Sequence, residues 1–294
     1  MDYQWYPGHM TKARRMMQEN IGLVDLVIEL ADARIPLSSR NPDIDALAQN
    51  KARILLMTKA DMADPVRTAL FQRYFEEKGF MVIAVDARTR KANEKIRAYV
   101  EKACAAKRER DKRRGIIGRP LRAMVVGIPN VGKSTFINSF AGKASAKTGN
   151  KPGVTRGKQW IRLNKNLELL DTPGILWPRF EDRHVGVNLA LTGAIRQELL
   201  DEQELSLELL DFLQKEYPAL VIGKYAPADG DARWELPMDS AKLLALIAES
   251  RNLLRTGGEP DYQRASKMVL DDFRNGKTGR ITLETPPAGG NESE

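Results

Sequence analysis

The sequence predicts an α/β protein in which a mostly parallel, doubly wound sheet is followed by an all-helical carboxy-terminal domain. Three observations support this prediction. Short apolar runs rich in β-branched residues alternate with helix-like segments, a pattern typical of a parallel sheet covered on both faces. A glycine-rich loop separates one apolar run from a helix-like segment. Beyond residue 178, the segments have helical periodicity without convincing strands.

In the first part of the chain, strands and helices are expected to alternate. The apolar runs predict strands at residues 23–31, 53–57, 81–85 and 122–126. The segments between them predict helices at residues 43–49, 65–78 and 91–114. Two further short runs, at residues 160–163 and 167–170, predict a hairpin that adds an antiparallel edge to the sheet.

The last part of the chain is expected to hold helices at residues 184–195, 198–216, 240–254 and 261–275. Three prolines are expected to lie in a loop in its middle: Pro218, Pro227 and Pro237. The chain therefore divides into an amino-terminal basic and aromatic arm (1–22), an α/β domain (23–178), a helical domain (179–284) and a disordered tail (285–294).

Composition narrows the class of protein. A chain of 294 residues is long enough for two domains that each bury a core. Its one cysteine, Cys104, excludes an internal disulfide framework and favours a reducing compartment. The amino terminus lacks a secretory pattern, and no apolar run approaches the roughly 20 residues that span a bilayer. We therefore expect a soluble, cytosolic protein.

The net charge of +8 conceals an uneven distribution. Residues 1–180 contain 34 Lys and Arg against 18 Asp and Glu, whereas residues 181–294 contain 13 against 21. Such a basic domain suits a polyanionic partner such as nucleic acid, although lysine and arginine also simply solvate surfaces. The basic excess gathers in residues 3–15, 107–114 and 142–158, and on the last helix in Arg264, Lys267, Arg274, Lys277 and Arg280.

The glycine-rich loop, Gly127-Ile-Pro-Asn-Val-Gly-Lys-Ser134, has the spacing of a phosphate-binding loop. Its backbone N–H groups and the helix amino terminus that follows can surround a triphosphate. Lys133 is expected to reach the terminal phosphates, and the Ser134 hydroxyl is expected to bind Mg²⁺. The residues expected to bind the nucleotide here are Asn130, Val131, Gly132, Lys133, Ser134 and Thr135.

Asp171-Thr-Pro-Gly174 follows the second strand of the expected hairpin. Alone it could be a simple turn, but its distance beyond the phosphate loop is typical of a GTPase. Asp171 could hold Mg²⁺ through water, and the Gly174 N–H could contact a γ-phosphate. Thr155, in the loop between the two motifs, is expected as a second hydroxyl ligand of Mg²⁺, with a plain loop threonine as the alternative.

Base selection is expected from Thr58-Lys59-Ala60-Asp61. The Asp61 carboxylate can accept two hydrogen bonds from guanine, whereas adenine would leave it facing a lone pair. The aliphatic stem of Lys59 can lie along the base. Asp86 and Ala87, just after the next strand, could present a backbone N–H to the guanine oxygen.

These motifs resemble those of the translation-factor-related GTPases, but the guanine motif precedes the phosphate loop by some 66 residues. That order fits a circular permutation, so the chain resembles the circularly permuted GTPases. Further motifs are similar to those of the ribosome biogenesis GTPase A family: Tyr6-Pro-Gly-His-Met10, Asp32-Ala-Arg-Ile-Pro36 and Gly276-Lys-Thr-Gly-Arg-Ile-Thr-Leu-Glu284. The resemblance implies a circularly permuted P-loop GTPase fold, over essentially the whole chain to residue 284.

The resemblance also implies a function. It implies a GTPase that binds ribosomal RNA on the maturing large subunit and leaves on hydrolysis, with residues 179–284 as an RNA-binding helical domain. The cofactors implied are GTP or GDP and Mg²⁺, with K⁺ as an option. The chain is expected to be monomeric off the ribosome and not to bind membranes. A switch acting on a protein effector is the alternative, and a GTP-using RNA-modifying enzyme is a third reading without visible catalytic groups.

The water-orienting group of hydrolysis is not evident, because Ile175-Leu-Trp177 stands where signalling GTPases carry a glutamine. His9 is one option, since the family's amino-terminal histidine is proposed for that role, but it could instead pack the arm or touch RNA. K⁺ beside Asn130 is the other, as in potassium-dependent GTPases, unless Asn130 is a simple loop residue. Both routes predict slow intrinsic turnover, on the order of 10⁻³ s⁻¹ or below, raised by the ribosomal partner.

Two expectations concern mechanics. Thr58 stands where the family usually has an asparagine that tethers the base loop to the phosphate loop, so guanine affinity is expected to be somewhat lowered. The segment after Gly174 runs directly into the helical domain. Loss of γ-phosphate contacts could therefore release or rotate that domain.

Overall fold

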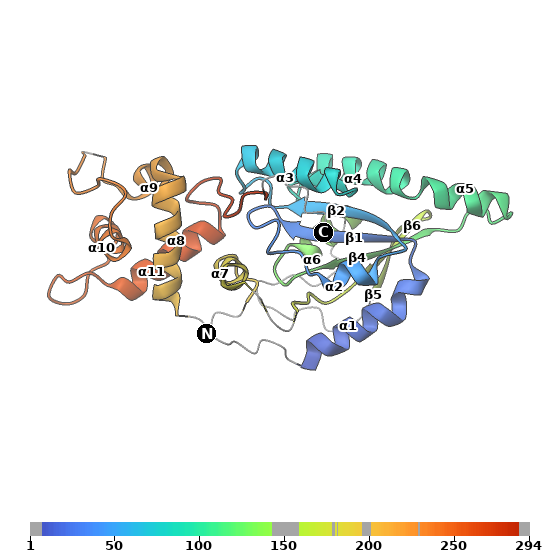
Figure 1. Ribbon diagram of the computed structural model, residues 1–294, viewed down its shortest axis with the longest axis horizontal. Coiled ribbons are helices and arrows are strands. Elements are labelled where there is room, and N and C mark those ends of the chain that lie inside the picture. The colour runs from blue at the N-terminus through green and yellow to red at the C-terminus, as the bar shows by residue number, and fades with distance from the viewer. Residues whose placement is uncertain are drawn as a thin grey trace, which may run out of the picture.

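A computed structural model describes residues 8–142, 159–177, 180, 182–195, 201–228 and 230–287. A six-stranded sheet lies at the centre of the larger part of the molecule (Figure 1). Its strands are β1 (Leu26–Asp32), β2 (Ala52–Thr58), β3 (Met81–Ala84), β4 (Leu121–Gly127), β5 (Gln159–Asn164) and β6 (Leu167–Asp171). Thr155, the arm before residue 8 and the expected tail from residue 288 on lie outside the described residues.

The strands are ordered β3-β2-β1-β4-β6-β5. All neighbouring pairs are parallel except β5 and β6, which form the expected antiparallel edge. Strand β1 is central: Leu26 pairs with Ala52 on one side and with Ala123 on the other. The mostly parallel, doubly wound sheet that the sequence predicts is therefore confirmed.

Helices cover both faces of the sheet because side chains of a strand alternate between its faces. On one face, Leu26, Ile28 and Leu30 pack with residues of α4 (Arg90–Ala103) and α6 (Lys133–Ala141). On the other face, Val27 packs with residues of α1 (Gly8–Asn20) and α2 (Asp43–Leu47), and Ala31 packs with α3 (Pro65–Glu77). All of these strand side chains are buried.

Helix α1 changes the expected description of residues 1–22 as a separate basic and aromatic arm. From residue 8 onward this segment is a helix whose Met10, Ala13 and Met17 are buried. Its arginines face outward, where Arg15 pairs with Glu19 at 2.9 Å. The apolar spacing of these three residues accounts for the packing, since positions three and four apart share one helix face.

The expected helix at residues 91–114 is two helices, α4 and α5 (Ala105–Arg113), which meet at Cys104. The Cys104 side chain is buried in the core, whereas α5 buries no residue. Figure 1 shows α5 projecting beyond the end of the sheet. A helix with no apolar face gains nothing from packing, so α5 remains in solvent.

Beyond the sheet, a group of helices forms the other part of the molecule (Figure 1). They are α7 (Arg183–Leu191), α8 (Glu202–Glu216), α9 (Pro218–Tyr225), α10 (Ser240–Ser250) and α11 (Tyr262–Arg274). An aspartate caps four of the helices, as Asp201 does by accepting from Gln203 N and Glu204 N at the start of α8. Pro218, expected in a loop, instead begins α9, where its missing N–H costs nothing.

After α11 the chain returns to the sheet-containing part. Ile281 N donates to Met62 O at 2.9 Å, and Leu283 N donates to Arg34 O at 2.8 Å. The Arg280 guanidinium donates to the carbonyl oxygens of Ala60 and Ala63, both at 3.0 Å. Arg280, expected on an RNA-facing stripe, thus serves a contact within the protein.

No helix within the described ranges has the length and apolar character needed to cross a membrane.

Candidate functional site

The sequence motifs follow strands whose carboxyl ends meet at one edge of the sheet. The loop Gly127–Ser134 follows β4, Thr58 ends β2, and Asp171 ends β6. Asp86 lies two residues beyond β3. In open α/β sheets, ligands bind outside this edge, so the fold places all four motifs around one candidate site.

The phosphate-binding loop depends on its two glycines. Gly127 has φ 155°, and a Cβ there would lie 2.8 Å from Leu30 O. Gly132 has φ 101°, a conformation that L side chains rarely adopt, and α6 begins at the next residue. Ser134 and Thr135 therefore lie in the first turn of α6, where backbone N–H groups and the helix dipole favour an anion.

Lys133 is buried beneath the loop, with 8% of its surface exposed. Its Nζ donates to Ile128 O at 3.1 Å and to Gly127 O at 3.3 Å. Burial lowers the pKa of Lys133 to about 8, although the charge of Asp171 opposes this. A buried ammonium that is bonded to neutral carbonyl oxygens would be strongly stabilised by a phosphate oxygen, because its hydrogen bonds to an anion are stronger.

The D-T-P-G segment packs directly on the phosphate loop. The Thr172 hydroxyl donates to Val125 O at 2.7 Å, and Ile175 N donates to Gly127 O at 3.3 Å. A Cβ at Gly174 would lie 2.7 Å from Pro129 N and 2.8 Å from the Nζ of Lys133. No side chain fits at this position, so glycine brings the two motifs into contact.

The base motif is attached to the phosphate loop by two side chains. The Thr58 hydroxyl lies 2.6 Å from Val131 O and 3.1 Å from Ala31 O. The Nζ of Lys59, whose pKa is lowered by burial, donates to Asn130 O at 2.7 Å. Thr58 thus supplies the tether that the family resemblance assigns to an asparagine.

Two carboxylates of the site share one guanidinium, which sequence reasoning missed. Arg88 Nη2 donates to Asp61 Oδ2 at 2.6 Å and to Asp86 Oδ2 at 3.0 Å. The hydrogen bond from Arg88 lowers the pKa of Asp86. Ala87, between Asp86 and Arg88 in the chain, is buried. Ala60 N donates to Val85 O at 3.3 Å, and this bond joins the loop after β2 to the loop after β3. The only sequence signal was a basic residue directly after Asp86-Ala87.

A buried ion pair, Asp32 with Arg34, contacts the base motif through Lys59 and was also not foreseen from the sequence. Asp32 is buried, and it accepts hydrogen bonds from Arg34 Nε at 2.9 Å, from Arg34 Nη2 at 2.8 Å and from Lys59 Nζ at 2.7 Å. Burial alone would raise the pKa of Asp32, but the two cations hold it well below its usual range. The motif Asp32-Ala-Arg-Ile-Pro36 was visible in the sequence, but its contact with Lys59 was not.

Two connections lead from the site to the helical part. Asn130 Nδ2 donates to Gly193 O, just after α7, at 2.6 Å. Arg34 Nη1 donates to Arg274 O at 3.3 Å, and the Arg274 guanidinium donates to Ala190 O and Leu191 O, both at 3.0 Å. Arg274, like Arg280, therefore donates to carbonyl oxygens within the protein.

Two expected site residues have no described side chain. Thr155 lies outside the described residues, and His9 lies in the first turn of α1 with its side chain among the parts that are not described. Within the described residues, no three His, Cys, Asp or Glu side chains are grouped to hold a metal ion. The Ser134 hydroxyl, in the first turn of α6, is the described group that would contribute an oxygen ligand to Mg²⁺, and oxygen ligands suit that ion.

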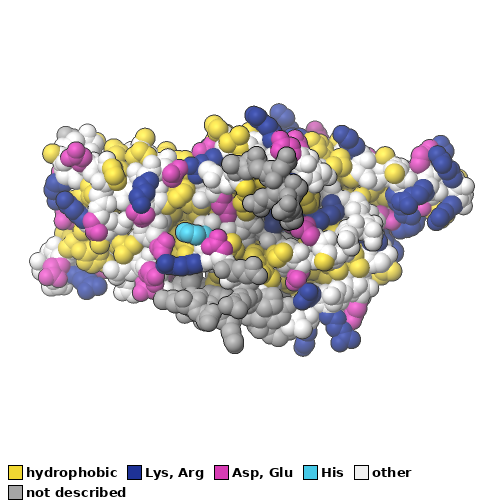
Figure 2. Space-filling view, viewed as in Figure 1, with side chains coloured by type: hydrophobic (Ala, Val, Ile, Leu, Met, Phe, Trp, Pro, Cys, Tyr) yellow, Lys and Arg dark blue, Asp and Glu magenta, His cyan; other side chains and the backbone are white. Residues whose placement is uncertain are grey.

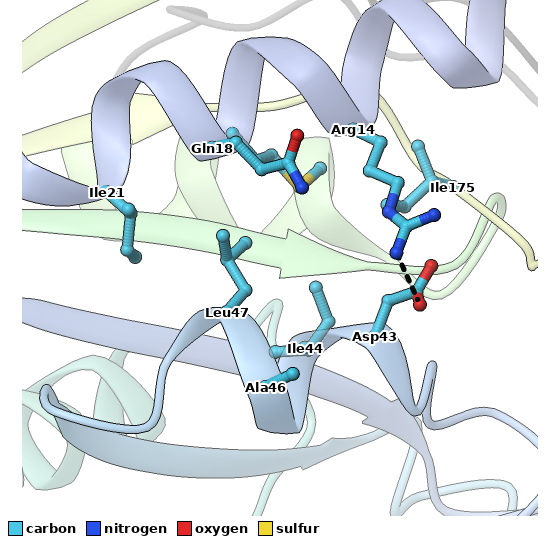
Figure 3. A pocket seen from close by; sticks show the side chains of 9 residues that line it. Arg14, Gln18, Ile21, Asp43, Ile44, Ala46, Leu47 and Ile175 are labelled. Carbon is cyan, nitrogen blue, oxygen red and sulfur yellow. Dashed lines mark hydrogen bonds and ion pairs between the residues drawn. The ribbon is translucent and has the colours of Figure 1, made fainter.

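A pocket of about 440 Å³ lies between α1 and α2 (Figure 3). Its lining is largely apolar and includes Ile175 from the segment after Gly174. Arg14 and Asp43 form an ion pair of 3.1 Å beside it. The pocket thus adjoins the residue that directly follows Asp171-Thr-Pro-Gly174.

The comparisons with known proteins match the chain to GTPases. Residues 122–223 match the family model described as 50S ribosome-binding GTPase. Ribosome biogenesis GTPase A of Bacillus cereus is 46% identical over all of this chain and 97% of its own length. The protein of that name from Thermotoga maritima is 30% identical over 96% of this chain and 94% of its own length. A crystal structure of GNP-bound YlqF from T. maritima, 26% identical, has a TM-score of 0.63 and covers 94% of this chain and 99% of that chain.

Proposed function

This chain belongs to the ribosome biogenesis GTPase A family, and from that premise we propose that it binds ribosomal RNA on the maturing large subunit and leaves when GTP is hydrolysed. It is a guanine-nucleotide-binding GTPase and a ribosome biogenesis factor. The observation that best supports the proposal is the joining of phosphate loop, guanine motif and helical part by direct hydrogen bonds. A nucleotide bound here contacts groups that also hold the helices.

In this proposal, Asp61 accepts two hydrogen bonds from guanine, and the stem of Lys59 lies along the base. Lys133 and the N–H groups of the phosphate loop bind the phosphates. Ser134 and Thr155 supply hydroxyl oxygens to Mg²⁺, and Asp171 holds the ion through water. Burial of Lys133 and the contact of Gly174 with the loop support these roles.

Two routes to water activation remain in the proposal. In one, His9 orients the attacking water. In the other, the Asn130 amide oxygen coordinates K⁺ beside the phosphates, while its amide nitrogen remains on Gly193 O. Turnover measured in KCl and in NaCl separates them: equal rates with His9→Ala inactive favour histidine, whereas a rate that requires KCl favours the ion.

The basic surfaces are the proposed RNA contacts. Figure 2 shows Lys and Arg side chains gathered at the end of the molecule where α5 projects. The exposed residues there are Arg110, Lys112, Arg113 and Arg114. On and after α11, Arg264, Lys267, Lys277 and Arg280 are exposed, whereas Arg274 is partly buried. Because Arg280 also donates to carbonyl oxygens of the base loop, the proposed RNA contacts here are Arg264, Lys267 and Lys277. Phosphate contacts of this kind give affinity without base specificity.

Co-sedimentation with ribosomal particles tests the proposal. With a non-hydrolysable GTP analogue, the protein should sediment with immature large subunits, and with GDP it should not. Between about 50 and 200 mM salt, binding should weaken steeply, because released counterions drive phosphate contacts. A protein that stays off the particles in both states, or whose binding ignores salt, would favour a switch acting on a protein effector.

A further inference from the structure

The guanine end of the site contains a cation that no motif assigns. Arg88 lies two residues beyond Asp86, and its Nη2 donates to both Asp61 and Asp86 while its Nε donates to Asp86 at 2.8 Å. We propose that Arg88 is a positioning residue for guanine recognition: it fixes the Asp61 carboxylate and neutralises the neighbouring Asp86. The proposal rests on the proposed role of Asp61 as the guanine acceptor.

The need for such a cation follows from the two carboxylates. Because one nitrogen donates to an oxygen of Asp61 at 2.6 Å and to an oxygen of Asp86 at 3.0 Å, those oxygens are close neighbours. Two carboxylate charges that lie this close repel one another. Asp61 must carry its charge and keep its orientation to accept two hydrogen bonds from guanine. Arg88 removes the repulsion that would oppose both.

The geometry leaves room for the base. Each carboxylate oxygen has two acceptor positions, so Asp61 Oδ2 can receive Arg88 and a guanine N–H together. The side chain of Asp61 is 32% exposed and that of Arg88 is 63% exposed, so the guanidinium does not seal the carboxylate from solvent. The backbone also fixes Asp86, whose Oδ1 accepts from Arg88 N at 3.0 Å.

An arginine suits this position better than a lysine. A planar guanidinium can donate through separate nitrogens to two carboxylates at once, as Arg88 does through Nε and Nη2. An ammonium carries its charge on a single nitrogen, so it could not orient Asp61 and pair with Asp86 in this fixed geometry. Arg88→Lys should therefore keep the neutralisation and lose the orientation.

The test compares nucleotides that differ only where Asp61 would read the base. Inosine diphosphate lacks the exocyclic amine of GDP, so the ratio of the two dissociation constants reports the Asp61 contact. In the full-length protein, Arg88→Ala should weaken GDP binding by up to about fivefold, the upper end of the range for exposed ion pairs. Binding of inosine diphosphate should weaken less, so the dissociation constant of inosine diphosphate divided by that of GDP should fall. Arg88→Lys should lie between, and Arg73→Ala, an exposed arginine on α3, should leave both constants unchanged.

A second variant separates positioning from a merely structural role. If Asp86 repels Asp61 once Arg88 is lost, Arg88→Ala with Asp86→Asn should recover part of the GDP affinity that Arg88→Ala loses. Unchanged or tighter GDP binding in Arg88→Ala, or an equal loss for both nucleotides, would overturn the proposal. Asp61→Ala identifies which claim fails: if it leaves the ratio intact, the base-site assignment is wrong, and if it alone collapses the ratio, only the role of Arg88 is wrong.

Discussion

Thr58 shows how a single substitution at a family position can preserve a contact. Its hydroxyl lies 2.6 Å from Val131 O, so the base motif remains attached to the phosphate loop with a shorter side chain. The expected penalty for lacking asparagine therefore need not arise from a missing tether. Thr58 is buried, and its one hydroxyl proton can be donated to Val131 O, the nearer of the two carbonyl oxygens beside it.

Thr58→Val should weaken GDP binding. The change keeps the shape and removes the donor, which leaves the buried Val131 carbonyl without this bond and costs about 1–2 kcal/mol, or about five- to thirtyfold. Titration with a fluorescent GDP analogue measures the loss. Thr68→Val is the matched control, because the Thr68 hydroxyl donates to the O of Asp64, the residue before α3, and not to the phosphate loop. Equal affinity in Thr58→Val and the native protein would show that the tether carries no binding energy.

Lys133 predicts a pH dependence of nucleotide affinity. Burial holds its pKa at about 8 in the free protein, and a bound polyphosphate must raise that pKa because it favours the charged form. Binding above pH 8 therefore requires proton uptake, so affinity should be constant below pH 8 and fall by up to about tenfold per unit above it.

The measurement is the GDP dissociation constant at pH 7, 8 and 9. Lys133→Arg remains charged throughout this range, so its affinity, whatever its absolute value, should not fall between pH 8 and 9 beyond changes common to both proteins. The same slope in both would assign the pH dependence to the nucleotide or to another group.

At the scale of elements, the segment Arg280–Glu284 explains why the motif at the end of the chain accompanies the nucleotide motifs. Arg280 holds the Ala60 and Ala63 carbonyls of the base loop. Glu284 accepts from Leu37 N at 2.6 Å and from Asn188 Nδ2 at 3.1 Å, which ties the loop after β1 to α7. This segment is a strap across the guanine side of the site.

Truncation after Gly279 should therefore affect both stability and binding. It removes several hydrogen bonds worth about 0.5–1.5 kcal/mol each, so the Tm should fall by about 5–10 °C, and GDP should bind more weakly because the base loop loses Arg280. Thermal unfolding and GDP titration measure the two effects. Truncation after residue 287 is the control and should change neither. A normal GDP affinity in the shorter protein would show that the strap does not support the base loop.

The elements also show what sequence patterns can and cannot predict. The parallel strands were predictable because they are short apolar runs, and the phosphate loop because its glycines have fixed spacing. The break at Cys104 was not, since it depends on where the core ends. Nor were the partners of Arg88 and Arg274, because side-chain contacts between distant segments leave no periodic signal. Basic residues counted as RNA contacts proved to bind carbonyl oxygens within the protein.

For the whole molecule, the hydrogen bonds around the site form a closed circuit. Lys59 joins Asn130 to Asp32, Arg34 joins Asp32 to Arg274, and Arg274 holds the end of α7. The circuit closes where Asn130 Nδ2 donates to Gly193 O, two residues beyond Leu191. Both the phosphate loop and the base motif are thus bonded to the helical part, independently of the chain that leaves D-T-P-G.

Such a circuit makes nucleotide binding and helix docking reciprocal. If nucleotide favours the arrangement in which Asn130 holds Gly193, then loosening that arrangement must weaken nucleotide binding by the same factor. Arg274→Lys should do this, because an ammonium cannot reproduce the guanidinium's bonds to Ala190 O and Leu191 O. Hydrogen exchange in residues 183–195 should accelerate, and the dissociation constant of the GTP analogue should rise in proportion.

Arg264→Lys, an exposed change on the same helix, should alter neither quantity. The comparison is decisive because both readouts come from one protein under one condition. Faster exchange after α7 with unchanged nucleotide affinity would mean that the helices move independently of the site, and release on hydrolysis would then have to act through D-T-P-G alone. Proportional changes would instead show that the coupling runs through the circuit, which contains the buried ion pair of Asp32 and Arg34.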